Sequence, residues 1–200
     1  ETPKVDSVRR FVVGGRHHDI AVATLTEEGV LRYRGPGKTR TWIAEQGEID
    51  YPLTGSSLRG EAKPALTRWR RLATVEVPIA QGRYPQQRYS LLEIRPETGR
   101  YRQIRRHFHH VSHHLLADTS HGRGDHNRLM RQHYGVHRLM LHALRLEVVH
   151  PSTQGTLVLE APLDAAWQRL LDAFDWTHAV PKSWCRRDFS ADVPRGADRD

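Results

Sequence analysis

Two strand-like segments joined by a short turn constrain the fold of this chain more than any other feature. Residues 66–77, L-T-R-W-R-R-L-A-T-V-E-V, alternate in part between apolar and polar side chains, and residues 88–94, R-Y-S-L-L-E-I, form a second strand-like run. The G-R-Y-P sequence at 82–85 favours a turn between them. An antiparallel pair of strands is therefore predicted.

The second half of the chain predicts another hairpin and a closing helix. Residues 144–149 and 156–160 alternate, and the polar, Pro- and Gly-containing segment 150–155 separates them. Five apolar residues then recur at helical spacing: Leu163, Trp167, Leu170, Leu171 and Phe174. The predicted class is α+β, with a mixed, largely antiparallel sheet and flanking helices.

A helix is predicted to begin near residues 98–99. Ile104, Phe108, Val111 and Leu115 follow at the spacing of one buried stripe, while arginines and histidines lie off it. Residues 122–132 are rich in Gly, Asn and Arg, so a polar loop is predicted there.

The chain is strongly basic, with 31 Lys and Arg against 23 Asp and Glu and a net charge of +8. Such a charge attracts polyanions such as RNA, although a protein can be basic without binding one. No run of 18 apolar residues and no apolar leader is present, so neither a membrane span nor a secretory signal is expected. The single cysteine, Cys185, fits a reducing cytoplasm.

The 14 histidines raise the alternative of a metal site. His109 and His113 stand one helical turn apart, as do His110 and His114, but no H-E-x-x-H motif is present and no cysteine joins them. A histidine-rich surface that faces RNA is the preferred interpretation, and no metal is expected.

Several ordered motifs carry a family resemblance. Residues 98–107 read T-G-R-Y-R-Q-I-R-R-H, residues 116–118 read L-A-D, residues 138–143 read R-L-M-L-H-A and residues 150–153 read H-P-S-T. In this order they resemble the RluA-type RNA pseudouridine synthases, and the resemblance covers residues 47–176. It is closest to the members that act on tRNA. Several ordered motifs are more specific than any single one.

The resemblance implies an enzyme that flips a uridine of tRNA out of its stack and isomerises it to pseudouridine. It implies a covalent aspartate and no metal or organic cofactor. Arg105, the arginine of Q-I-R, is the expected partner of that aspartate, whose ionised form it stabilises. The alternative is that Arg105 is only a solvated helix residue.

The remaining motif residues are expected to bind substrate. Arg100, Arg102 and Arg106 are interpreted as phosphate or ribose contacts, and Tyr101 either stacks on a base or packs against the protein. Asp118 is interpreted as structural, capping a backbone segment or pairing with an arginine.

The sequence also departs from the family pattern. Arg102 stands where His or Lys is usual, and Ala117 stands where the family has Gly. The aspartate motif H-R-L-D-x-x-T-S-G is absent, and residues 3–10, P-K-V-D-S-V-R-R, offer only Asp6 as a nucleophile. Three explanations remain: a fragment that lacks the first half of the catalytic domain, a shifted reading frame, or a diverged RNA binder without catalysis.

The expected organisation follows from these matches. Residues 1–46 are a poorly matching remnant or mis-framed segment, residues 47–176 are the C-terminal part of the catalytic domain, and residues 177–200 are a loosely ordered tail. The domain is therefore expected to be incomplete at its N-terminus, and its sheet to have raw edges. A monomer that binds tRNA is expected.

Overall fold

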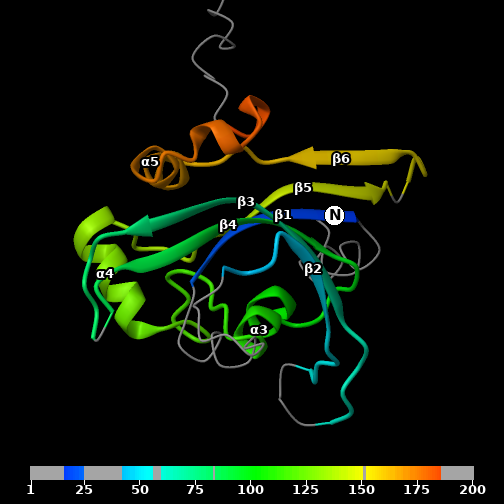
Figure 1. Cartoon of the computed structure of the whole chain (residues 1–200). Coiled ribbons are helices and arrows are strands. Elements are labelled where there is room, and N and C mark those ends of the chain that lie inside the picture. Colours follow the sequence, from blue (N-terminus) through cyan, green and yellow to red (C-terminus); the bar gives the residue numbers. More distant parts are fainter. Residues whose placement is uncertain (1–15, 25–41, 56–59, 83, 151, 186–200) are drawn as a thin grey trace, which may run out of the picture.

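The computed structural model describes residues 16–24, 42–55, 60–82, 84–150 and 152–185, and for 16–24 it describes the backbone only. Its strands form a six-stranded sheet in the order β2-β3-β4-β1-β5-β6, and every pairing is antiparallel (Figure 1). The α+β class is confirmed. The strands are β1 (Arg16–Thr24), β2 (Gln46–Asp50), β3 (Leu66–Val77), β4 (Gln87–Pro96), β5 (Leu141–Val149) and β6 (Thr156–Glu160). The helices are α3 (Gln103–His110), α4 (Gly124–Tyr134) and α5 (Ala165–Ala173), followed by 3-10 helices at Thr177–Ala179 and Lys182–Trp184.

The predicted antiparallel pair of residues 66–77 and 88–94 is confirmed as β3 and β4. The register runs from Thr67 opposite Pro96 to Val77 opposite Gln87, with one irregularity between Arg71 and Ala73. The hairpin of β5 and β6 is also confirmed. β1, from the segment whose sequence was least informative, lies between β4 and β5.

Strand β4 is buried on both faces, and every residue from Tyr89 to Ile94 is buried. Leu92 and Ile94 belong to a core cluster with Phe108 of α3. Tyr89 and Leu91, which point to the opposite face, belong to a second cluster with α4 and α5. In Figure 1, α3 lies below the sheet, α5 lies above it, and α4 lies beside the left-hand ends of β3 and β4.

The buried stripe predicted after residue 98 is confirmed, but the helix that carries it is shorter than the spacing suggests. α3 ends at His110, and Leu115 reaches the same core cluster from the loop beyond it. The chain leaves the helix through Ser112, whose φ of 59° is left-handed. Helical spacing therefore predicted the burial of Leu115 correctly and its secondary structure wrongly.

The prediction of a polar loop at residues 122–132 is wrong, because most of this segment is helix α4. Leu129 and Met130 are its buried apolar residues, and His126 and Asn127 complete the buried face. Polar residues at buried positions hid the amphipathic pattern. The helix ends at Gly135, which adopts a left-handed conformation with φ 62°, a common helix terminus.

The closing helix is confirmed as α5. The Asp164 carboxylate caps it by accepting hydrogen bonds from the backbone N–H of Ala166 and Trp167 at 3.0 and 3.1 Å. The next segment packs against the same core, where Trp176 and Val180 are buried. Residues 186–200 of the expected tail lie outside the described residues. Within the described part of the chain, no helix has the length and apolarity needed to cross a membrane.

Candidate active site

Gln103 fixes the connection between β4 and α3. Its Oε1 accepts hydrogen bonds from Thr98 Oγ1 at 2.7 Å and from the Arg100 backbone N–H at 3.0 Å. Its Nε2 donates to the Leu66 carbonyl oxygen at 2.9 Å and to Thr67 Oγ1 at 3.0 Å. A buried amide with both ends satisfied holds its surroundings in one arrangement. The T-G-R-x-x-Q part of the motif is therefore anchored on β3.

The next two residues project outward from this anchor. Arg102, the residue before α3, has a left-handed backbone with φ 51° and ψ 34°. Tyr101 is 46% exposed, and the Arg102 guanidinium carbon lies 5.0 Å from the centre of its ring. Of the two interpretations of Tyr101, packing into the protein is not what the structure shows. An exposed aromatic ring beside a cation is suited to contact a nucleotide base.

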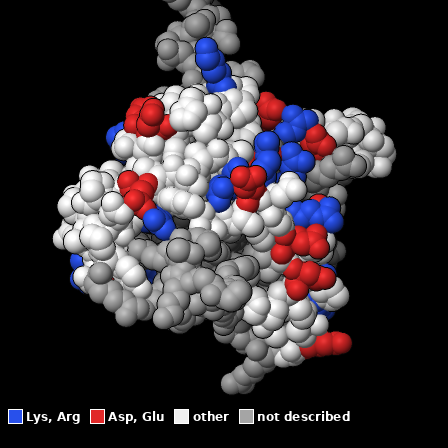
Figure 2. Space-filling model, viewed as in Figure 1, with Lys and Arg blue, Asp and Glu red and all other residues white. Residues whose placement is uncertain are grey.

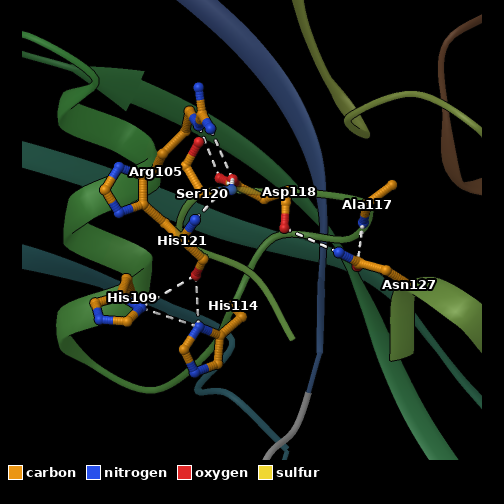
Figure 3. A network of polar contacts seen from close by, with 8 residues as sticks. All are labelled: Arg105, His109, His114, Ala117, Asp118, Ser120, His121 and Asn127. Carbon is orange, nitrogen blue, oxygen red and sulfur yellow. Dashed lines mark hydrogen bonds and ion pairs between the residues drawn. The ribbon is translucent and has the colours of Figure 1, made fainter. Parts of the chain in front are cut away.

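Arg105 forms a bidentate ion pair with Asp118, as Figure 3 shows. Its Nε donates to Asp118 Oδ2 and its Nη2 to Asp118 Oδ1, both at 2.7 Å. The Asp118 side chain is 0% exposed and that of Arg105 is 19% exposed. The interpretation of Asp118 as an arginine partner is confirmed, and Arg105 is not a solvated helix residue.

The pair is fully ionised because its hydrogen bonds outweigh burial. Burial alone would raise the pKa of Asp118, but donors from Arg105 and from the backbone N–H groups of His121 and Ser120 lower it to about 2. The hydrogen bond to Asp118 in turn raises the pKa of Arg105. Both charges therefore persist throughout the neutral range.

Asn127 of α4 holds the loop that presents Asp118 (Figure 3). Its Nδ2 donates to the Asp118 carbonyl oxygen at 2.9 Å, and its Oδ1 accepts from the Ala117 backbone N–H at 2.8 Å. The loop is tight as well, because a Cβ on Gly122 would lie 2.1 Å from the Asp118 carbonyl oxygen. The position of Arg105 thus depends on a loop that α4 secures.

Ala117 stands in this loop with a left-handed φ of 57°, which explains why the family has glycine there. We expect Ala117→Gly to raise the free energy of unfolding by about 0.5–1 kcal/mol, since the strain relieved exceeds the added freedom of the unfolded chain. Urea unfolding measures this change. Ala143→Gly, in strand β5, is the control and should instead destabilise. A loss of stability in Ala117→Gly would contradict the prediction.

Two histidine rings approach the His121 carbonyl oxygen of the same loop (Figure 3). His109 Nδ1 and His114 Nδ1 lie 3.1 and 2.7 Å from the His121 carbonyl oxygen and 3.2 Å from each other. Both rings can donate to this one oxygen, which ties the loop to α3. Among the described residues, no group of three or more His, Cys, Asp or Glu side chains is arranged to hold a metal ion.

Arg106 and His107 attach residues 51–54 to α3. Arg106 Nη1 donates to the Thr54 carbonyl oxygen at 2.7 Å and Nη2 donates to Thr54 Oγ1 at 3.0 Å. His107 Nε2 lies 3.0 Å from the Tyr51 carbonyl oxygen, and the Tyr51 ring stacks on His110 with centroids 3.7 Å apart. Arg106 therefore carries internal contacts.

Of the residues predicted from the sequence to bind substrate, some contact the protein itself and others are exposed. Arg100 donates from Nε to the Pro64 carbonyl oxygen at 3.0 Å, so it too contacts the protein. Tyr101 and Arg102 are exposed. Asp6 lies outside the described residues.

Sequence reasoning missed the supporting residues. Gln103 and His107 belong to the quoted motif, but nothing local shows that their partners lie on β3 and at Tyr51. Asn127 fell in the segment predicted as a loop. For the two motif residues the signal was the fixed spacing from Arg105; for Asn127 there was none.

Comparisons with known proteins identify proteins that this chain is similar to. The sequence model of the family described as RNA pseudouridylate synthase matches residues 31–110. The tRNA pseudouridine synthase C of Vibrio cholerae is 45% identical over 150 residues, which cover 70% of this chain and 62% of the relative. The protein of that name from Salmonella typhi is 40% identical over 164 residues, which cover 78% of this chain and 63% of the relative. The chain thus spans less than two thirds of the curated relatives it matches.

A solved structure shares the fold. Human RNA Pseudouridylate Synthase Domain Containing 1 superposes with a TM-score of 0.51 at 18% identity, covering 86% of this chain and 69% of that one. The ordered motifs, the sheet that carries them and the sequence relatives agree, and over residues 31–110 the chain matches the family described as RNA pseudouridylate synthase.

Proposed function

We propose that this chain belongs to a tRNA pseudouridine synthase, which isomerises a uridine of tRNA to pseudouridine. The observation that carries the proposal is the bidentate pair between Arg105, in the motif of residues 98–107, and Asp118, in the motif of residues 116–118. The relatives named tRNA pseudouridine synthase C support tRNA as the substrate. We further propose residues 47–176 as the C-terminal part of the catalytic domain, a monomeric state and a cytoplasmic location.

The reaction exchanges one bond for another on the same ribose. The bond from uracil N1 to the ribose breaks, the base rotates, and C5 bonds to the same carbon; C5 loses a proton and N1 gains one. The base must first leave the stack. A carboxylate that acts covalently on the flipped nucleotide divides the reaction into easier steps.

Asp118 is unsuited to that covalent role. Its side chain is 0% exposed, and its oxygens accept hydrogen bonds from Arg105, Ser120 and His121. We therefore keep Asp6 as the proposed nucleophile, with Asp118 as the residue that positions Arg105.

Arg105 retains donors for the nucleotide or the nucleophile. Asp118 occupies its Nε and Nη2, and Nη1 makes no hydrogen bond to any residue that the structure describes. A pre-oriented guanidinium of low exposure interacts strongly with an anionic group, since little solvent screens it. We propose that Arg105 orients the ionised nucleophile through this remaining edge.

Arg105→Lys tests this role. Lysine keeps the charge but cannot both pair bidentately with Asp118 and present a further donor. We expect pseudouridine formation to fall on the order of 100-fold, the effect of losing one positioned donor. Release of tritium from tRNA labelled at uracil C5 measures the rate, and Arg169→Lys on the exposed face of α5 is the matched control. An Arg105→Lys rate equal to that of the wild type would exclude the role, and tRNA binding without any tritium release by the wild type would favour an RNA binder.

A further inference from the structure

Most arginines of the described residues are already neutralised. Nine of them form ion pairs with acidic side chains: Arg68, Arg70, Arg71, Arg88, Arg95, Arg105, Arg123, Arg138 and Arg145. Figure 2 shows the consequence over the strands, at the right of the view, where positive and negative side chains interleave. This surface offers little net attraction for a polyanion, despite the many arginines on it.

Helix α4 differs from this pattern. Arg128 and Arg131 are exposed, and neither forms an ion pair or a side-chain hydrogen bond with another described residue. They are three residues apart, so they lie on one face of the helix, opposite the buried Leu129 and Met130. α4 thus carries uncompensated positive charge on a rigid, regular element.

The same face adjoins the candidate active site. Arg131 and the exposed His137 line a cavity of about 220 Å³, whose other walls include Asp118, Gly122 and Asn127. These last residues belong to the loop that holds Arg105 or secure that loop. Asp118 adds no exposed negative charge to this wall, because its side chain is 0% exposed and paired with Arg105. A strand of RNA whose uridine reaches Arg105 would therefore have α4 beside it.

We propose that the exposed face of α4, carrying Arg128 and Arg131, binds backbone phosphates of the RNA whose target uridine enters the site at Arg105; this rests on the proposed function. Arginine suits the role because its planar guanidinium bonds phosphate oxygens bidentately. Such contacts position the RNA without reading its sequence. Because charges on a polyanion release counterions when they are neutralised, the contacts are visible in the salt dependence of binding.

The experiment measures the dissociation constant for unmodified tRNA as a function of KCl concentration. Each phosphate contact contributes about 0.7–0.9 to the slope of log K against log salt. We expect Arg128→Gln and Arg131→Gln each to reduce the slope by about one, and the double variant by about two. Arg131→Lys keeps the charge and should keep most of the slope. Arg169→Gln, equally exposed on α5 and without an ion pair in the described part of the chain, should not change it.

Two results would overturn the proposal: an unchanged slope in the double variant, or an equal reduction in Arg169→Gln. Thermal unfolding of each variant establishes that its fold is retained. Tritium release by the wild-type chain is measured separately and decides the proposed function. A reduced slope without tritium release refutes catalysis but supports phosphate binding by α4. Tritium release with an unchanged slope supports catalysis but refutes phosphate binding by α4.

Discussion

Replacement of Asp118 by asparagine is expected to lower the free energy of unfolding by about 3 kcal/mol. The change removes one partner of a buried ion pair and leaves the Arg105 guanidinium without its counter-charge, the costly way to break such a pair. The amide also cannot accept all the hydrogen bonds from Arg105, Ser120 and His121 that the carboxylate accepts. Urea unfolding at pH 7 measures the loss.

The control is a carboxylate in an exposed pair. Glu97 lies 3.4 Å from Arg68, and their side chains are 47% and 56% exposed. Glu97→Gln should change stability by less than about 1 kcal/mol, since solvent screens such pairs. Equal losses of stability in the two variants would mean that the buried Asp118 pair stabilises the fold no more than an exposed pair does.

The pH dependence provides an independent check of the same prediction. The pKa of Asp118 is lowered from 3.8 to about 2 on folding, so the ionised carboxylate stabilises the fold above pH 4, and this stabilisation is lost as the pH falls toward 2. The difference in pKa corresponds to about 2 kcal/mol. The stability difference between the wild type and Asp118→Asn should therefore shrink over this interval. A constant difference would contradict the assignment of the low pKa.

Replacement of Asp6 by asparagine is expected to abolish pseudouridine formation. An amide has almost the size of a carboxylate but cannot form the covalent bond to the nucleotide, so tRNA binding should persist while tritium release from C5 ceases. Asp50→Asn, on the edge strand β2, is the matched control. Unchanged activity in Asp6→Asn would rule out Asp6 as the nucleophile and direct the search to another aspartate.

Local pattern predicted the regular parts of the fold because their burial is local. β3, β4, β5, β6 and α5 show alternation or helical spacing in their own residues, and each formed as expected. α4 did not show it, because half of its buried face consists of His126 and Asn127, whose burial depends on Tyr89 and on the Asp118 loop. The place of β1 between β4 and β5 depends on pairings with distant strands, which periodicity does not specify.

In the candidate site too, some features could be predicted from the sequence and others could not. The motif identified Arg105, and its helical position off the apolar stripe left it available for function. Its partner lies 13 residues away on an irregular loop, where no spacing rule applies. The internal contacts of Arg100 and Arg106 were equally invisible, because Pro64 and Thr54 approach α3 only in the folded chain. The sequence therefore identified Arg105 as a candidate functional arginine, and the structure shows which residue positions it.

The central claim is that Arg105 acts in pseudouridine formation because Asp118 positions it. A double-mutant cycle tests this claim directly, with the rate of tritium release measured for the wild type, Arg105→Lys, Asp118→Asn and the double variant. The account predicts that both single variants are slowed severely and that the double variant is little slower than either. Single effects that multiply in the double variant, or an Asp118→Asn rate equal to that of the wild type, would contradict it.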